Sequence, residues 1–84
     1  MPDKPHITYP CPWTYRIIGE RSENIIQAVE EIIPDRDSYD LIKGNVSKHG
    51  NYVSLYLKII VLSEKQKDHY KSALMKSKGI IIVL

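Results

Sequence analysis

The stretch Ser47-Lys48-His49-Gly50-Asn51-Tyr52 and the strand that follows it decide the fold of this chain. The dipeptide Gly50-Asn51 is a turn signal between two runs of strand-forming residues. Residues 52–61 then alternate strictly, which predicts a strand with two different faces. One face is aliphatic and is expected to meet a core, through Val53, Leu55, Leu57, Ile59 and Val61. The other face is expected to meet solvent or a partner, through Tyr52, Ser54, Tyr56, Lys58 and Ile60.

The length and composition are typical of one small globular domain: 84 residues, of which 43% are hydrophobic and 26% are charged. Four of the five prolines lie within residues 1–12, where they remove hydrogen-bond donors and disfavour helix. We therefore expect an extended N-terminal segment over residues 1–12 and a single domain over residues 13–84.

Three further strands are predicted. The first covers residues 13–20, and its expected core face consists of Trp13, Tyr15, Ile17 and Gly19. The second covers residues 39–46, with a candidate bulge at Gly44, and its expected core face consists of Ile42, Gly44 and Val46. The last strand covers residues 80–84, which are aliphatic throughout.

Two helices are predicted between these strands. The first is expected to have Ser22 as its N-cap and to stop at Pro34. Its buried stripe follows helical spacing, through Ile25, Ala28, Val29, Ile32 and Ile33. The second is expected to have Ser63 as its N-cap, with Gln66 completing a capping box.

The resulting order β-α-β-β-α-β is the pattern of a ferredoxin-like fold. Right-handed crossovers place both helices on the same face of an antiparallel sheet. The sequence therefore predicts an α+β sandwich with a four-stranded antiparallel sheet in the order 4-1-3-2. Two helices cover one face of this sheet, and the other face stays open.

The net charge of +2 is spread unevenly. Residues 1–40 hold four basic and eight acidic side chains, whereas residues 41–84 hold eight basic and two acidic ones. Packing of the acidic first helix beside the lysine-rich second helix is the simpler account of this asymmetry. The alternative is that the basic half binds an anionic partner.

Several classes of protein are disfavoured by composition. The longest apolar runs, residues 59–62 and 80–84, are too short to span a bilayer, and the first residues lack the apolar centre of a signal peptide. A single cysteine excludes an internal disulfide. We therefore expect a soluble cytoplasmic protein that makes no contact with a membrane.

No constellation of residues indicates catalysis or metal binding. Cys11 has no base at a defined spacing, and His6, His49 and His69 lack the spacing of metal ligands. We therefore expect no enzyme activity, no metal and no cofactor.

Three stretches together resemble the YbeD-like family of small uncharacterised bacterial proteins. They are Pro12-Trp13-Thr14-Tyr15-Arg16-Ile17-Ile18-Gly19, Ser47-Lys48-His49-Gly50-Asn51-Tyr52-Val53-Ser54 and Ile80-Ile81-Ile82-Val83-Leu84. The chain departs from that pattern at Trp13, where phenylalanine is usual, and at Lys48-His49, where Ser-Lys is usual. The resemblance implies a ferredoxin-like fold similar to ACT domains. These regulatory domains often dimerise and bind amino acids near the loop after the first strand.

In this chain that loop supplies the candidate ligand-binding residues Gly19, Arg21 and Ser22. Arg21 precedes a helix N-terminus, where backbone amides already attract anions. The arrangement also resembles acylphosphatases, which share the fold and bind phosphate after the first strand. Their glycine-rich phosphate loop is missing here, and Arg21 and Asn45 are the two residues that match their pattern. Anion-dependent hydrolysis is therefore a distant alternative.

The open sheet face supplies the candidate interaction surface, through Arg16, Ile18, Tyr56, Lys58, Ile60, Ile81 and Val83. A sheet face exposed to water is normally more polar than this set, which favours a contact with a protein partner or a second copy. The competing account is that the N-terminal segment folds back over this face. Aromatic and basic side chains on a sheet also suit RNA, but the sequence matches the RNA-binding motifs poorly.

We therefore expect a noncatalytic ACT-like module that regulates or bridges other molecules. Its partner would be a protein, a second copy of the chain or a small anionic ligand. Nucleic-acid binding is the first alternative, and acylphosphatase-like hydrolysis is the second.

Overall fold

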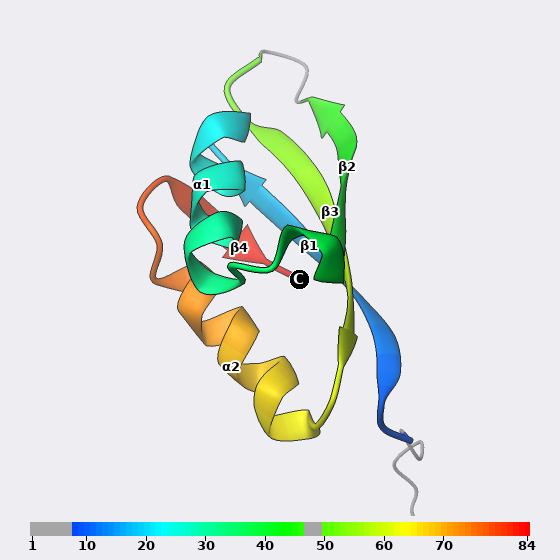
Figure 1. Ribbon diagram of the computed structural model, residues 1–84. Helices are drawn as coiled ribbons and strands as arrows, with labels where there is room; N and C mark the ends of the chain where they lie inside the picture. Colours follow the sequence, from blue (N-terminus) through cyan, green and yellow to red (C-terminus); the bar gives the residue numbers. More distant parts are fainter. Residues whose placement is uncertain (1–7, 47–49) are drawn as a thin grey trace, which may run out of the picture.

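The computed structural model describes residues 8–46 and 50–84, and its helices and strands follow the predicted β-α-β-β-α-β order (Figure 1). The elements are β1 (Cys11–Gly19), α1 (Ser22–Ile32), the 3₁₀ helix η1 (Arg36–Ser38), β2 (Tyr39–Val46), β3 (Val53–Val61), α2 (Glu64–Met75) and β4 (Ile80–Val83). In the turn that leads into β3, residues 47–49 lie outside the described residues, and Gly50 has a positive φ of 69°. This φ is the conformation for which glycine is suited.

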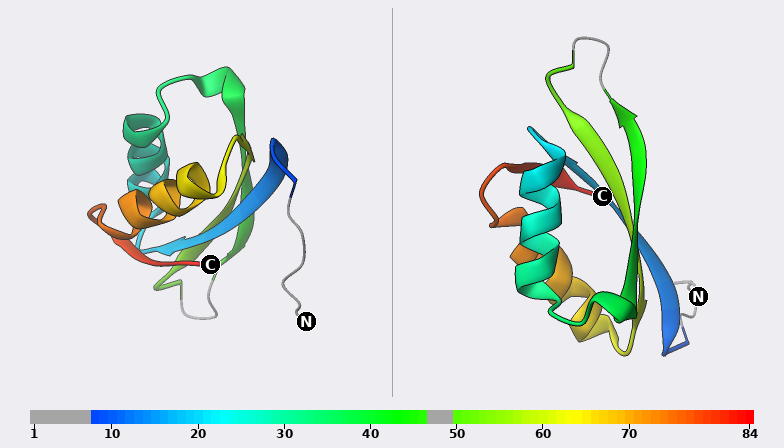
Figure 2. Two further views of the ribbon diagram at one scale, coloured as in Figure 1. Left: turned by 90° about the horizontal axis from the view of Figure 1, so that it is seen from below. Right: turned by 45° about the horizontal axis from the view of Figure 1, so that its top comes forward.

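The sheet has the strand order β2-β3-β1-β4, and each neighbouring pair is antiparallel. This is the predicted order 4-1-3-2, counted from the opposite edge. Both helices pack on the same face of the sheet, and the described residues place no helix on the other face (Figures 1 and 2). The predicted α+β ferredoxin-like fold is therefore confirmed.

The two central strands, β1 and β3, supply most of the sheet's contribution to the core. They pair along their whole lengths, from Cys11 opposite Val61 to Gly19 opposite Val53. The predicted core face is confirmed, because the buried apolar side chains of these strands are Tyr15, Ile17, Leu55, Leu57, Ile59 and Val61. Ser54, which was predicted to meet solvent or a partner, is buried as well, and its hydroxyl donates to the Asn45 carbonyl at 2.9 Å. β1 begins two residues before the predicted first strand, since Cys11 and Pro12 continue its pairing with β3.

The predicted facing of β2 is wrong at Ile42. Leu41 lies opposite Leu57 and packs against the core, so Ile42 lies opposite Tyr56 on the open face and is 43% exposed. The predicted bulge at Gly44 is confirmed by a register shift between Lys43 and Val46. Gly44 also lies on the open side, where a Cβ atom would be 2.5 Å from Ser54 Oγ and 2.9 Å from Tyr56 Cε2. The side chain of Val46, which was predicted to face the core, lies outside the described residues.

The helices differ in their caps. The predicted N-cap of α1 is wrong, because Ser22 is already helical and Arg21 occupies the N-cap position without a side-chain hydrogen bond. The predicted cap of α2 is confirmed, because Ser63 Oγ accepts a hydrogen bond from the Gln66 amide at 3.0 Å. The Gln66 side chain accepts in turn from the Leu62 amide at 2.7 Å, one residue before the cap.

The helices also differ in how much of their surface they bury. The predicted stripe of α1 is confirmed, since Ile25, Ala28, Val29 and Ile33 are buried and Ile32 packs against them. In α2, Leu74 is the one buried side chain. α2 therefore depends more than α1 on its caps and on single contacts with the sheet.

The predicted facing of β4 is wrong at Val83. Its side chain is 2% exposed and belongs to the core, because Val83 lies opposite the buried Ile17. Ile82 lies opposite Ile18 and takes the open side, and Ile81 lies at an irregularity in the register with 47% exposure. The strand is aliphatic at every position, so its sequence carries no alternation from which the facing could be read.

The register of β3 leads to a prediction about stability. Leu57→Ala should lower the free energy of unfolding by about 2–5 kcal/mol, because it leaves a cavity at a fully buried position. Leu62→Ala is the matched control, since Leu62 is 64% exposed and should change stability by at most about 0.5 kcal/mol. Urea denaturation measures both changes, and similar midpoint shifts for the two variants would contradict the assigned facing.

Candidate functional site

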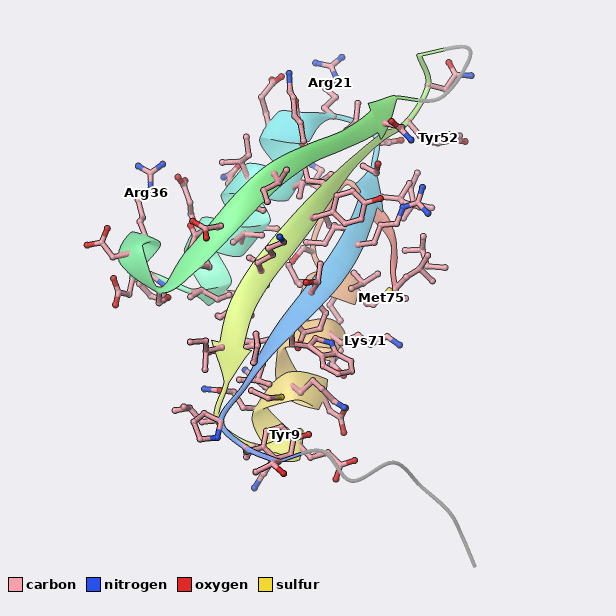
Figure 3. The ribbon with its side chains drawn as sticks, turned by 90° about the vertical axis from the view of Figure 1, so that its right-hand side faces the viewer. Tyr9, Arg21, Arg36, Tyr52, Lys71 and Met75 are labelled. Carbon is pink, nitrogen blue, oxygen red and sulfur yellow. The ribbon has the colours of Figure 1, made fainter. Side chains whose placement is uncertain are left out.

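The open face of the sheet brings together side chains from all four strands. Residues that lie opposite each other in neighbouring strands project to the same side of the sheet. One row across it therefore contains Ile42, Tyr56 and Arg16, and Leu84 extends this row because its backbone exchanges hydrogen bonds with Arg16 at 2.8 and 3.0 Å. Parallel rows add Ile18 with Ile82, Thr14 with Lys58, and Pro12 with Ile60. Figure 3 shows this side of the molecule, with both helices behind the sheet.

The open face exposes large aliphatic side chains. Ile60 is 60% exposed, Leu84 is 58% exposed, and Ile42 and Ile82 are 43% and 38% exposed. Single exposed aliphatic residues are ordinary, but these four lie on one surface together with the half-buried Ile18 and Tyr56. Sequence reasoning missed Ile82 and Leu84, because an irregularity at Ile81 shifts which residues of β4 face outward. It missed Ile42 because Leu41 and Ile42 are adjacent aliphatic residues, and the register with β3 decides which of them faces the core.

Two positive charges lie within this aliphatic surface. Arg16 lies on β1 and Lys58 lies on β3, and neither forms an ion pair with another described residue. Asp40 is opposite Lys58 in β2, without a contact close enough to be an ion pair. The surface therefore combines exposed aliphatic groups with two basic side chains that form no ion pair with a described residue, and it carries the Asp40 carboxylate beside Lys58.

The predicted ligand loop packs against the turn between α2 and β4. The Glu20 amide donates to the Gly79 carbonyl at 3.1 Å, and a Cβ atom on Gly19 would lie 2.7 Å from that same oxygen. Gly79 has a positive φ of 83° and lies directly beside the Asn24 side chain. Gly19 is therefore required for the close approach of the two turns, which is a structural role.

The other two residues of this loop lie at the surface. Arg21 is exposed and Ser22 is half-buried, at the start of a helix with no side-chain cap. The first amides of such a helix lack intrahelical partners and are available to solvent or to an anion. Among the described residues, no hydrogen bond or ion pair joins Arg21 to Asn45, the two residues that suggested acylphosphatases.

The two helices pack side by side, but their opposite charges do not form ion pairs. Among the described residues the ion pair that forms is Arg36 with Glu30, at 3.4 Å, between two exposed side chains. A groove of about 490 Å³ between α1 and α2 has Glu31 on one side and Lys76 and Lys78 on the other. Direct pairing therefore does not account for the charge asymmetry, and Lys65 and Lys71 of α2 stay exposed at the surface.

Tyr15 connects α2 to the central strand. Its hydroxyl donates to the carbonyl of Lys67 at 2.6 Å, and the residue is 1% exposed. Burial, reinforced by the nearby Asp68 carboxylate, raises the pKa of Tyr15 to about 12. The Lys67 ammonium lies 4.3 Å from the centre of the Trp13 ring, so the same turn of α2 makes a second contact with β1.

The remaining candidates for chemistry are scattered. Cys11 is a free, half-buried thiol on β1, and His69 is exposed on α2 beside Tyr70. His6 and His49 lie outside the described residues. Within residues 8–46 and 50–84, no group of three potential metal ligands gathers in one place. Neither described helix is long and apolar enough to cross a membrane.

Comparison with known sequences identifies relatives along nearly the whole chain. The family model described as "Protein of unknown function (DUF493)" matches residues 4–84. An uncharacterised protein of Campylobacter jejuni is 32% identical over 79 residues, which is 93% of this chain and 90% of that protein. A UPF0250 protein of Shewanella woodyi is 26% identical over 77 residues, which is 90% of this chain and 88% of that protein.

Comparison with solved structures identifies the same fold in two other proteins. The solution structure of a Helicobacter pylori protein is similar with a TM-score of 0.82 and 23% identity, covering 100% of this chain and 94% of that chain. The ACT domain from the GTP pyrophosphokinase of Chlorobium tepidum is similar with a TM-score of 0.59 and 17% identity, covering 87% of this chain and 94% of that chain. At these identities the likenesses show the fold alone.

The fold and its surfaces define a small ferredoxin-like domain with ACT-like architecture, in which the described residues place both helices on one face of the sheet. Within that class, the chain belongs to the DUF493 family of proteins of unknown function. The resemblance to the YbeD-like family, drawn from three stretches of sequence, is confirmed.

The buried tyrosine leads to a prediction about pH. Tyr15→Phe should lower stability at neutral pH by about 1–2 kcal/mol, because it removes a buried hydrogen bond. In the folded protein the phenol keeps its proton up to a pKa of about 12, above the ordinary value of 10.0. The stability that the protonated phenol contributes is therefore complete below pH 10 and is lost as the pH rises towards about 12.

Urea midpoints of the wild type and of Tyr15→Phe, measured from neutral pH upward, should therefore converge above about pH 10. Tyr56→Phe is the control, because the Tyr56 hydroxyl makes no hydrogen bond to another described residue. The urea midpoint of Tyr56→Phe should stay close to that of the wild type at every pH. A gap between wild type and Tyr15→Phe that stays constant up to pH 12 would contradict the assigned role.

Proposed function

We propose that this protein is a noncatalytic, ACT-like interaction module that binds a protein partner on its open sheet face. The observation that supports this proposal is the exposure of Ile42, Ile60, Ile82 and Leu84 together on a face that neither helix covers. Aliphatic surface of this kind is unfavourable in water and is typical of contact sites. The single cysteine and the absence of a membrane-spanning helix among the described residues suit a partner in the cytoplasm.

The charges on the open face indicate the chemistry of the partner. Burying Arg16 or Lys58 without a carboxylate would leave a desolvated charge, which is costly. A suitable partner surface is therefore aliphatic and carries Asp or Glu opposite these two residues. A second copy fits less well where its two-fold axis passes near Arg16 and Lys58, because each of these residues would then lie close to the same residue of the other copy.

Nucleic acid is also less suited to this face. RNA-binding sheets of this fold stack bases on aromatic rings from their central strands. The aromatic residues of β1 are Trp13 and Tyr15, and both lie on the core side. β1 therefore contributes no ring to the open face, so the pair of rings on the two central strands that stacks successive bases is missing among the described residues.

Site-specific crosslinking in the native cells tests this proposal. A photo-crosslinking amino acid at position 60 should trap one defined protein, and the same amino acid at Lys65, an exposed residue of α2, should not. Arg16→Glu should reduce the yield at position 60 by at least about tenfold, because it places like charges opposite each other in the contact.

Other outcomes distinguish the competing accounts. An adduct of twice the 9.7 kDa chain mass would identify a homodimer, and an adduct removed by ribonuclease would identify RNA. Equal crosslinking from positions 60 and 65, or a yield at position 60 that Arg16→Glu leaves unchanged, would contradict docking on the open face.

A second candidate is a small anion bound at the loop after β1, near Gly19, Arg21 and Ser22. It is favoured by the uncapped N-terminus of α1 beside the exposed Arg21 guanidinium. Phosphate titrated into ¹⁵N-labelled protein should shift the amide signals of residues 21–23 first, and Arg21→Gln should remove that response. Shifts confined to the exposed lysines of α2 would instead indicate nonspecific attraction to its basic surface.

A further inference from the structure

The edge of β1 that faces β4 is only partly paired. β1 pairs with β3 along all nine of its residues, but it pairs with β4 only over Ile17–Gly19, and with Leu84 at Arg16. No other described strand pairs with this edge beyond Arg16. Among the described residues, nothing pairs with the β4 side of β1 from Cys11 to Tyr15, and this free backbone edge lies in line with the end of β4 (Figure 1).

The free edge offers a specific set of hydrogen-bonding groups. The amide and carbonyl of Arg16 both point towards the β4 side, since they bond to Leu84. In an antiparallel strand this direction repeats at every second residue. The amide and carbonyl of Thr14 therefore point to the free edge, and so does the carbonyl of Pro12. Pro12 has no amide hydrogen, so it limits how far another strand can extend along this edge.

A small hollow accompanies this edge on the helix side of the sheet. Its volume is about 190 Å³, and it is lined by Trp13, Tyr15, Lys67, Asp68, Lys71 and Leu84, so two lysines face one carboxylate. The hydroxyl of Tyr15 is already bonded to the Lys67 carbonyl, and the Lys67 ammonium lies over the Trp13 ring. Lys71 is exposed, takes part in no ion pair with a described residue, and lies beside β1 at its β4 side (Figure 3).

We propose that this edge binds a short extended peptide segment of another protein, which continues the line of β4 and places a carboxylate side chain against Lys71. An extended backbone is the occupant that can bond to the amide and carbonyl of Thr14 together. Lys71 selects an acidic side chain by charge complementarity. This surface is separate from the open face, and the inference does not depend on the function proposed above.

The geometry also sets the pattern of the peptide. A segment antiparallel to β1 begins beyond Leu84, so its first residues lie opposite Tyr15, Thr14, Trp13 and Pro12 in turn. Residues opposite Tyr15 and Trp13 project to the helix side and enter the hollow. The residues between them project to the open side. The expected sequence therefore has an acidic residue, then a β-branched residue, then an apolar residue that packs on Trp13.

The blocked tetrapeptide acetyl-Glu-Thr-Val-Thr-amide is a suitable probe, titrated to millimolar concentration into ¹⁵N-labelled protein. The Thr14 amide proton should move downfield and exchange more slowly with solvent, and the indole signal of Trp13 should shift. Lys71→Gln should raise the Kd by about threefold, which is the scale expected for one exposed charged contact. Lys65→Gln removes an exposed lysine of the same helix outside the hollow, and it should leave the Kd unchanged.

A gain-of-function variant makes the test independent of any loss of stability. Pro12→Thr adds an amide donor at the free edge and should tighten binding of the probe by about threefold or more. The peptide with Lys in place of Glu should bind more weakly than the probe. The inference is overturned if the Thr14 signal does not respond, if shifts concentrate on the open face at Tyr56 and Arg16, or if the Glu and Lys peptides bind equally.

Discussion

The pairing of β1 with β3 is the interaction on which the rest of the structure depends. These two strands lie at the centre of the sheet, and their inward side chains form the sheet side of the core, on which the helices pack. α1 packs against these side chains with a wide aliphatic stripe, whereas α2 adds Leu74 and the contacts of Lys67 with Tyr15 and Trp13. The same pairing fixes which side chains face outward, so it also determines the composition of the open face.

Sequence reasoning succeeds where an element carries an unbroken pattern over its whole length. β3 alternates without interruption, and α1 has a continuous helical stripe, so the facing of each was predicted correctly. The strand order follows from the handedness of the two crossovers, which leaves few arrangements to consider. These elements were sufficient to predict the fold and to locate the open face.

The same reasoning fails where local irregularities shift the pattern. An irregularity at Ile81 changes which residues of β4 face outward, and the aliphatic sequence of β4 offers no polar position to reveal the change. In β2 the adjacent Leu41 and Ile42 are both aliphatic, so the register with β3 is needed to tell which of them faces the core. The cap of α1 was misplaced by one residue, because its amides are left without the side-chain acceptor that a serine usually supplies. The candidate surfaces were thus predicted in outline, and their exact membership required the register of the strands.

The central pairing also shapes how the chain reaches this structure. Residues paired between β1 and β3 are separated by 34 to 50 positions in the sequence, from Gly19 with Val53 to Cys11 with Val61. Of the three strand pairs that the structure describes, β2–β3 alone joins strands that follow each other in the sequence, and β2 contributes little to the core by itself. The entropy of closing that long loop must be overcome before the core contacts form. The pairing of β1 with an already formed hairpin should therefore limit the folding rate. The chain should fold more slowly than a helical bundle of similar size.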